Sequence, residues 1–463
     1  MLSLNRSIRR PLTPHVNWYC HLVLSLLAIW TCAPKVVAAT NIIFIMADDM
    51  GCGDAGCYGQ TKIQTPNIDQ LANEGMRFTQ CYAGSTVCAP SRSVLMTGLH
   101  VGHTRVRGNF GVGGVVGLGG GKGRVPLREE DVTVAEVLRE AGYATGIMGK
   151  WGLGEPNTSG TPNRQGFDQW FGYLNQRRAH SYYPEFLWLN ENRFELPGNR
   201  DDEKSQYSHD LMLGFATQFI RKHQSDPFFL YLPFTIPHSK FQVPSLGQYQ
   251  DKPWPLQAKT YAAMITRMDR DIGILVELVE ALGLTEKTAI FFCSDNGAAD
   301  RYDGLFDSSG PLRGRKRDLF EGGIRTPMIV RWPGTVAAGT VNETPWTFAD
   351  FLPTAAEIAD THIPSNLDGI SILPTLMGKT QNLDDRFLYW EFFERGFQQA
   401  ARWQNWKAII PRVGAPMQLY NLESDLAEED NVAQKHPKVV NQFLEFLSSA
   451  RTDSREFPIR TQP

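Results

Sequence analysis

Three short apolar runs, each followed directly by polar residues, constrain the fold of this chain more than any other feature. They are Asn41–Ala47, residues 227–234 and Thr288–Ser294. Continuous apolar runs of this length are typical of strands that are buried on both faces, as in a parallel sheet. Residues 260–283, between the last two runs, carry apolar residues at three- and four-residue spacing, which predicts a long amphipathic helix against the sheet.

Helices alternate with these strands along the chain. Thr133 and Glu136 form a capping-box pattern, which predicts a helix start, and a short strand is predicted over residues 143–148. Alternation of this kind predicts an α/β fold with a large, mostly parallel sheet that helices flank on both faces.

The C-terminal part has a different pattern. Short strands at meander spacing begin after about Thr380, and a helix is predicted over residues 437–450. We therefore expect a main α/β domain over residues 40–380 and a smaller C-terminal α+β domain over residues 381–463.

The N-terminus has the pattern of a secretory signal peptide. Three arginines precede an apolar run over residues 22–30, and Val37 and Ala39 supply the small residues of a cleavage site. We expect residues 1–39 to be removed on export to the periplasm or the exterior. The apolar run is short for a membrane span, so we expect no stable membrane partner, with a retained anchor as the alternative. A net charge of −3 without a basic block argues against nucleic-acid binding.

Cleavage would leave an odd number of cysteines, namely Cys52, Cys57, Cys81, Cys88 and Cys293. In an exported protein, an odd count singles out one thiol as special. Cys52 and Cys57 could be joined by a disulfide.

Cys88 stands at the predicted start of a short helix. Pro90 has the φ of a first helical turn, and Gly98 can end the helix. A helix start favours a bound anion, and Arg92, one turn on, adds a cation. The pattern predicts a nucleophile beside an oxyanion site, although a buried structural cysteine fits the same spacing. A cysteine-phosphatase loop would need arginine at position 94, where this chain has valine.

Four oxygen-bearing side chains follow two of the predicted strands: Asp48 and Asp49 after the first, and Asp295 and Asn296 after the last. The carboxyl ends of parallel strands meet at one edge of a sheet, where ligands bind. Carboxylate and amide oxygens suit Ca²⁺ or Mg²⁺ rather than zinc. Taken singly, each pair also fits a turn or a helix cap.

Residues 108–123 are rich in glycine. No clear strand precedes them, and Lys122 is followed by glycine rather than serine or threonine. We therefore interpret this stretch as a surface loop near the site and not as a phosphate-binding loop.

Cys88-x-Pro90-Ser91-Arg92, followed by Leu95-x-Thr97-Gly98, resembles the signature of the type I sulfatases, in which a maturase oxidises the cysteine to formylglycine. The resemblance runs from about Asn41 to Asp425 and implies an alkaline-phosphatase-like fold. The other motifs occur in the family's order: Asp48-Asp49-x-Gly51, Gly149-Lys150-Trp151, Ser294-Asp295-Asn296-Gly297, Leu312-Arg313-Gly314-x-Lys316 and Glu321-Gly322-Gly323-Ile324-Arg325.

The resemblance also implies roles for individual residues. An oxygen of the residue made from Cys88 would bind Ca²⁺ together with Asp48, Asp49, Asp295 and Asn296, with Mg²⁺ as the alternative ion. The side chains that would hold the oxidised residue or the sulfate ester are Arg92, Lys150, His238 and Lys316.

The mechanism that the resemblance implies uses both hydroxyls of a formylglycine hydrate. One hydroxyl attacks sulfur, and His238 or Lys316 assists departure of the alcohol as a general acid. The second hydroxyl then expels sulfate and restores the aldehyde. The expected enzyme is a sulfatase acting on an aryl or, preferably, a carbohydrate sulfate, after modification by a maturase.

One position departs from the family pattern. Many sulfatases have histidine two residues after the motif lysine, whereas this chain has Gly152. Our candidate for the missing role is His180, with His103 and His209 as alternatives. Arginines and aromatic residues that could line a sugar subsite, or simply pack, include Arg177, Arg178, Tyr182, Tyr183, Trp188 and Trp390.

Two other functions remain as alternatives. A phosphomonoesterase or phosphodiesterase on the same fold would typically use threonine or serine and a two-metal site with additional histidines. An inactive Ca²⁺-dependent glycan-binding protein would be consistent with the loss of histidine at Gly152.

Overall fold

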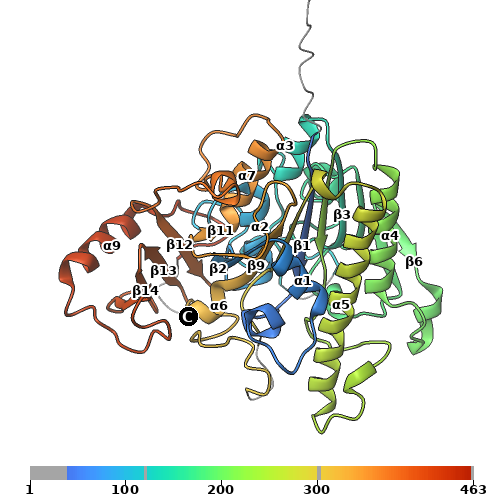
Figure 1. Cartoon of the computed structure of the whole chain (residues 1–463). Helices are drawn as coiled ribbons and strands as arrows, with labels where there is room; N and C mark the ends of the chain where they lie inside the picture. Colours follow the sequence, from blue (N-terminus) through green and yellow to red (C-terminus); the bar gives the residue numbers. More distant parts are fainter. Residues whose placement is uncertain (1–38, 119–121, 300–303, 460–463) are drawn as a thin grey trace, which may run out of the picture. The chain divides into compact units, whose positions relative to one another are not determined.

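The computed structural model describes residues 39–118, 122–299 and 304–459, and the predicted signal peptide lies outside them except for Ala39. Its main sheet contains β1 (Asn41–Ala47), β2 (Met76–Tyr82), β3 (Ala144–Lys150), β4 (Gln169–Tyr173), β5 (Phe186–Leu189), β6 (Asn192–Glu195), β7 (Phe228–Pro233), β8 (Thr288–Ser294), β9 (Arg325–Arg331), β10 (Thr340–Asn342) and β11 (Trp346–Thr347). The strand order is β10-β2-β9-β8-β1-β7-β3-β4-β5-β6, with β11 beside β2 (Figure 1).

The centre of this sheet is parallel, as predicted. Strands β8, β1, β7, β3 and β4 are parallel neighbours, whereas β9 runs antiparallel to β8 and β2, and β5 and β6 add an antiparallel edge. Side chains of β1 alternate between two hydrophobic clusters, with Phe44 in one and Ile45 in the other. The continuous apolar run at Asn41–Ala47 follows from this, because a core lies on each face of the strand.

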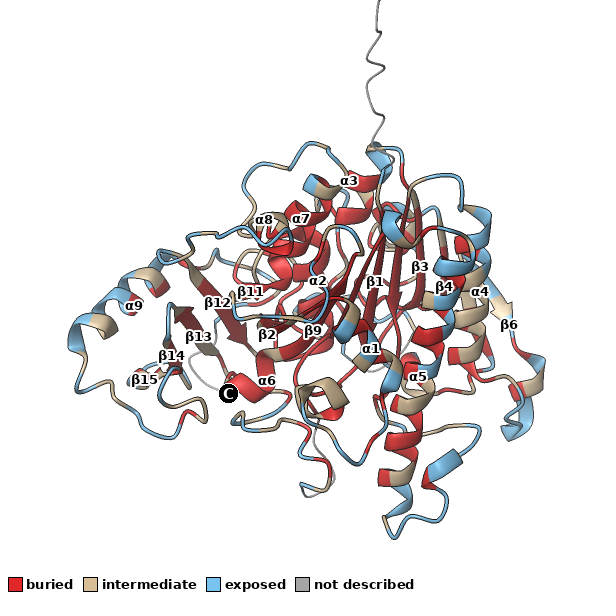
Figure 2. Ribbon diagram, viewed as in Figure 1, coloured by how far each residue is buried: buried red, intermediate tan, exposed pale blue. Residues whose placement is uncertain are grey.

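Helices cover both faces of the sheet. The helices are α1 (Pro66–Glu74), α2 (Cys88–Thr97), α3 (Val134–Glu140), α4 (Ser208–Lys222), α5 (Leu256–Ala281), α6 (Glu321–Ile324), α7 (Phe351–Ile358), α8 (Leu373–Leu376) and α9 (Pro437–Ser449). Buried residues of α2, α3 and α7 belong to one hydrophobic cluster, and those of α1, α4 and α5 to the other. Figure 2 shows the central strands of the sheet buried, whereas the edge strand β6 is partly exposed, and exposed residues lie on the outer sides of α4 and α5.

The C-terminal residues form a second, smaller sheet, as the change of pattern predicts. It is antiparallel, in the order β12 (Phe387–Phe392), β13 (Gln398–Trp403), β14 (Trp406–Ile410) and β15 (Gln418–Asn421). Trp390 Nε1 donates a hydrogen bond to the carbonyl of Ala83 at 2.9 Å, which ties this sheet to the end of β2. The fold is thus of the expected α/β class with an added C-terminal α+β part, while the boundary near residue 380 stays a prediction.

Two further features concern the sequence predictions about membrane spans and disulfides. Within the described residues, no helix is long and apolar enough to cross a membrane. All five cysteines of this part of the chain are free, so Cys52 and Cys57 do not form a disulfide.

Candidate active site

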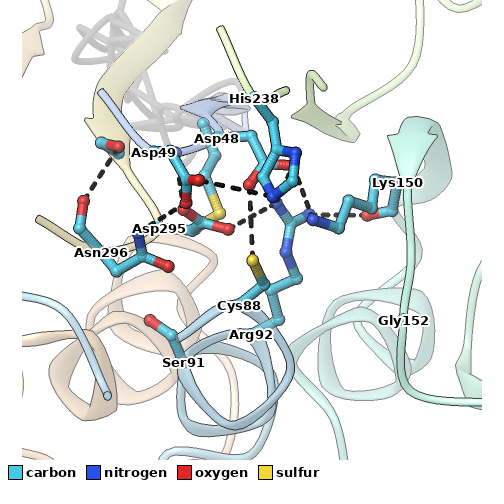
Figure 3. Close-up of polar contacts among 12 residues, drawn as sticks. Asp48, Asp49, Cys88, Ser91, Arg92, Lys150, Gly152, His238, Asp295 and Asn296 are labelled. Atoms are coloured by element: carbon cyan, nitrogen blue, oxygen red, sulfur yellow. Dashed lines mark hydrogen bonds and ion pairs between the residues drawn. The ribbon is translucent and has the colours of Figure 1, made fainter. Parts of the chain in front are cut away.

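The predicted site residues converge at one edge of the main sheet. Asp48 follows β1, Lys150 ends β3, His238 follows β7 and Asp295 follows β8. Because these four strands are adjacent and parallel, their carboxyl ends bring the four side chains together (Figure 3). Asn296 and Asp49 lie in the same group, and Lys316 reaches it from the loop between β8 and α6.

Cys88 is the first residue of α2, two residues earlier than Pro90, where the sequence predicts the first turn. Val87 is the N-cap, and Gly98 ends the helix in the left-handed region at φ 69°. All ten residues of α2 are buried. The Oδ1 atom of Asn109, from the glycine-rich stretch, accepts a hydrogen bond from the backbone N–H of Ala89 at 3.2 Å. The first residues of this stretch therefore lie at the site, as expected.

Each buried carboxylate of the site is paired with a buried cation. Lys150 Nζ lies 2.6 Å from Asp48 Oδ2, and Arg92 donates to Asp295 Oδ2 at 2.9 Å. The ammonium of Lys316 contacts Asp49 Oδ1. These pairs satisfy the rule that buried charges require partners of opposite sign.

Cys88 lies between the acidic and basic groups. Its Sγ is 3.5 Å from Asp48 Oδ1 and 3.4 Å from Lys316 Nζ. Burial, together with the negative charges of Asp295 and Asp48, raises the pKa of the thiol to about 12. The unmodified thiol is therefore protonated at neutral pH and is a poor nucleophile, since the thiolate is the reactive form.

The residues present fit a hard divalent cation. The Oδ2 atom of Asp49 and the Oδ1 atom of Asn296 are buried and have no hydrogen-bond partner among the described residues. Ligand atoms of Asp48, Asp49, Cys88 and His238 lie within 4.8 Å of one another. An oxygen-rich donor set with free buried oxygen atoms suits Ca²⁺. Asp295, also predicted as a ligand, accepts hydrogen bonds from Arg92 and from the Asp49 backbone N–H.

Two histidines stack at the mouth of the site. The ring centroids of His180 and His238 are 4.2 Å apart. His238 Nδ1 donates to the Ser239 carbonyl at 2.5 Å, so its Nε2 faces Asp49 Oδ2 at 3.4 Å. Burial, with the nearby lysines, lowers the pKa of His238 to about 3 and that of His180 to about 2, so both rings are neutral.

The other histidine candidates lie elsewhere. His209 is buried on α4 with its Nε2 2.9 Å from Asp271. His103 contacts Asp368 at 2.9 Å in a cluster with His100. Neither lines the cavity that contains Cys88. Of our three candidates for the missing histidine, only His180 is at the site.

A cavity of about 370 Å³ opens over Cys88, His238, His180 and Lys316. Its walls add residues that the motifs did not identify: Asn109, Phe110, Arg124, Gln176, Arg177, Ser239 and Arg317. Arg177 was one of the sugar-subsite candidates, and Asn109 and Phe110 begin the glycine-rich stretch. The remaining wall residues belong to no recognisable local motif, and only the folded chain brings them to the cavity.

Two of the aromatic candidates for a sugar subsite are packing residues instead. Tyr182 and Trp390 are almost fully buried. The Tyr182 hydroxyl bonds to the carbonyls of Thr235 and His238, at 2.5 and 2.7 Å. It thereby fixes the loop that carries His238.

Comparison with known proteins agrees with this architecture. A family model described as Sulfatase matches residues 40–361, and another, described as N-sulphoglucosamine sulphohydrolase, C-terminal, matches residues 314–453. The chain is 31% identical over 404 residues to an N-acetylgalactosamine-6-sulfatase of Canis lupus familiaris, covering 82% of this chain and 73% of that protein.

For a bacterial relative and a solved structure, the match covers more of both chains than the match to the canine protein does. The chain is 30% identical over 499 residues to an N-acetylgalactosamine-6-O-sulfatase of Bacteroides thetaiotaomicron, covering 89% of this chain and 93% of that protein. The structure of Ps i-CgsB in complex with k-i-k-neocarrahexaose superposes with a TM-score of 0.79 at 28% identity, covering 91% of this chain and 95% of the other.

The fold is that of the alkaline-phosphatase-like hydrolases. This chain belongs to the sulfatase family, and it is an enzyme of the sulfatase class.

Proposed function

We propose that this protein is an exported enzyme that hydrolyses the sulfate ester of a sulfated carbohydrate, using formylglycine made from Cys88 and a bound Ca²⁺. The names of the mammalian and Bacteroides relatives, both N-acetylgalactosamine 6-sulfatases, support a carbohydrate sulfate as substrate. So does the oligosaccharide bound to Ps i-CgsB.

The position of Cys88 is the observation that carries the proposal. Its thiol stands at the first turn of a buried helix, between the carboxylate of Asp48 and the ammonium of Lys316. When formed, formylglycine supplies a hydrated aldehyde for attack on sulfur, and Ca²⁺ supplies positive charge for that group and for the sulfate. A plain serine or cysteine would lack the second hydroxyl that releases sulfate.

Asp48, Asp49, Asp295 and Asn296 would hold the ion. Lys316 lies next to both Asp49 and the reactive position, so its ammonium can bind a sulfate oxygen there. The neighbouring positive charges stabilise negative charge as it develops in the transition state.

The alcohol leaves on the side of the cavity. Lys316, whose pKa the carboxylates raise against the effect of burial, remains protonated and can supply a proton. His238 Nε2 also faces the site, but the proton of this neutral ring is on Nδ1, so Nε2 can accept a proton and cannot donate one. Of the two groups, Lys316 is therefore the one that can act as general acid.

The experiment is to produce the mature chain with and without a formylglycine-generating maturase. We expect the peptide that contains Cys88 to shift by the mass difference between cysteine and formylglycine, and sulfate to be released from N-acetylgalactosamine 6-sulfate only by the modified enzyme. Cys88→Ala and Cys88→Ser should be inactive. Full activity of Cys88→Ala would overturn the mechanism, and release of phosphate with two zinc ions per chain would favour a phosphoesterase.

A further inference from the structure

We propose that Gln176 acts as a hydrogen-bond acceptor inside the active-site cavity, for a hydroxyl or N–H donor that enters with the substrate or forms at position 88. The inference rests on the proposed sulfatase function, since it assigns a role within that same site. Gln176 belongs to none of the motifs that the family resemblance uses.

The side chain of Gln176 has one fixed end and one free end. Its Nε2 donates to the carbonyl of Gly152 at 3.1 Å, which orients the amide because a carbonyl can only accept. Its Oε1 is buried and has no partner among the described residues. The residue is 7% exposed and lines the cavity that contains Cys88. No protein donor among the described residues satisfies this acceptor at the cavity wall, so it is available to a donor from a ligand.

The glycine at position 152 leaves room for the side chain of Gln176 at the cavity wall. Gly152 has φ 89°, a region that other residues rarely adopt, and a Cβ built on it would lie 2.6 Å from Gln176 Nε2. A larger side chain at position 152 and the observed position of Gln176 exclude each other. The glutamine amide therefore occupies the space that a side chain at position 152 would need.

The chemistry of the free atom excludes the sulfate group as its ligand. A sulfate monoester presents only acceptor oxygens at neutral pH, and an amide oxygen is also an acceptor. The partner must carry hydrogen. Two sources supply it, namely a hydroxyl of the hydrated residue made from Cys88 and a hydroxyl or amide N–H of the sugar that carries the ester.

The first test compares two leucine substitutions at buried glutamines. Gln176→Leu removes the Oε1 acceptor, together with the Nε2 donor to Gly152, while keeping the volume. Gln165→Leu is the control for a buried glutamine outside the cavity: Gln165 is fully buried, its Oε1 also has no partner among the described residues, and its Nε2 donates to the carbonyls of Arg128 and Ser159, so this variant loses at least as many protein hydrogen bonds as Gln176→Leu. We expect Gln176→Leu to lower kcat/KM for N-acetylgalactosamine 6-sulfate by about 10- to 100-fold. Gln165→Leu should remain within twofold of the wild type per formylglycine-containing molecule.

The second test separates the two donors. If the donor forms at position 88, Gln176→Leu will slow p-nitrophenyl sulfate to the same degree as the sugar sulfate. If the donor belongs to the sugar, p-nitrophenyl sulfate will be hydrolysed normally, and Gln176→Leu placed in the inactive Cys88→Ala background will bind the sugar sulfate at least tenfold more weakly by calorimetry.

The inference is overturned if Gln176→Leu, with normal formylglycine content and melting temperature, hydrolyses both substrates within twofold of the wild type. If the wild type releases no sulfate at all, the proposed function fails first. In that case the donor at position 88 fails together with the proposed function, and the calorimetric comparison decides the sugar donor, because equal binding by the two Cys88→Ala proteins would exclude it.

Discussion

At the scale of single residues, the site depends on how closely two loops approach. Gly51 lies two residues after Asp49, just beyond the end of β1, and an added Cβ would lie 2.0 Å from the backbone carbonyl oxygen of Ser308 and 2.7 Å from Ala298 Cβ. A backbone carbonyl cannot move aside as a flexible side chain can. Gly51 therefore lets the loop around Ser308 pack directly against the segment that carries Asp48 and Asp49.

We expect Gly51→Ala to lower both metal content and activity by more than about tenfold, because the clash displaces a segment that holds two predicted ligands. Metal analysis and kcat with p-nitrophenyl sulfate would measure the effect. Gly214→Ala is the control, since a Cβ there meets no atom within 4 Å. A Gly51→Ala enzyme with full metal content would show that the loops have room to separate.

The three buried carboxylates also predict the effect of removing the metal. Dialysis against a calcium chelator should abolish activity and lower the melting temperature, because ligand binding at 100 times Kd adds about 2.7 kcal/mol of stability. Ca²⁺ should restore both quantities better than Mg²⁺, which requires a stricter octahedral geometry. Chelated protein that is free of calcium and fully active would contradict the assignment.

The sequence predicted the members of the site but not their pairing. Motifs and strand ends identified Asp48, Lys150, Asp295 and His238, because the carboxyl ends of parallel strands share an edge. Which cation contacts which carboxylate depends on loop conformations that no local pattern encodes. Gln176 was missed for the same reason, since its significance arises only beside Gly152.

At the scale of elements, helix boundaries were predicted to within a few residues where a cap or a glycine marks them. Gly98 ends α2 as expected, and Thr133 caps α3 through both hydrogen bonds of a capping box. The helix predicted over residues 260–283 instead spans Leu256–Ala281. Its first residues carry no cap signal, and the antiparallel edges of the main sheet were likewise not marked by any pattern.

Glycines inside two long helices should respond to substitution in opposite directions. Gly214 in α4 has open space around it, so Gly214→Ala should stabilise the protein by up to about 1 kcal/mol through helix propensity. In α5, a Cβ at Gly273 would lie 2.3 Å from Asn67 Oδ1. Gly273→Ala should therefore destabilise the protein. Thermal unfolding of the two variants measures the sign, and equal shifts would show that packing at Asn67 is unimportant.

At the scale of the whole molecule, a buried charge cluster joins the C-terminal sheet to the main sheet. Lys407 on β14 is fully buried, with its Nζ 2.8 Å from Glu321 on α6 and 3.2 Å from Glu428. Glu321 Oε2 accepts a hydrogen bond from the Tyr82 hydroxyl at the end of β2. The cluster thus links three parts of the chain that are distant in sequence.

We expect Lys407→Met to destabilise the protein by about 3 to 5 kcal/mol, because it removes the cation that the buried carboxylates of Glu321 and Glu428 share, and only Glu321 keeps a second ion-pair partner among the described residues, Arg325 at 3.3 Å. Lys435→Met is the control, since Lys435 pairs with Asp430 at 3.6 Å on the exposed surface. Denaturant unfolding of both variants provides the measurement. Similar midpoints for the two variants would show that the buried cluster adds little.

The burial of Cys88 also sets an order of events during biosynthesis. Cys88 is 3% exposed within a helix that is buried along its whole length, so a modifying enzyme cannot bind the surrounding polypeptide once the fold has formed. The proposed oxidation of Cys88 would therefore have to compete with folding in time. Protein that is folded first and exposed to the maturase afterwards should keep its cysteine, as the mass of its Cys88 peptide would report, and slow folding should favour complete conversion.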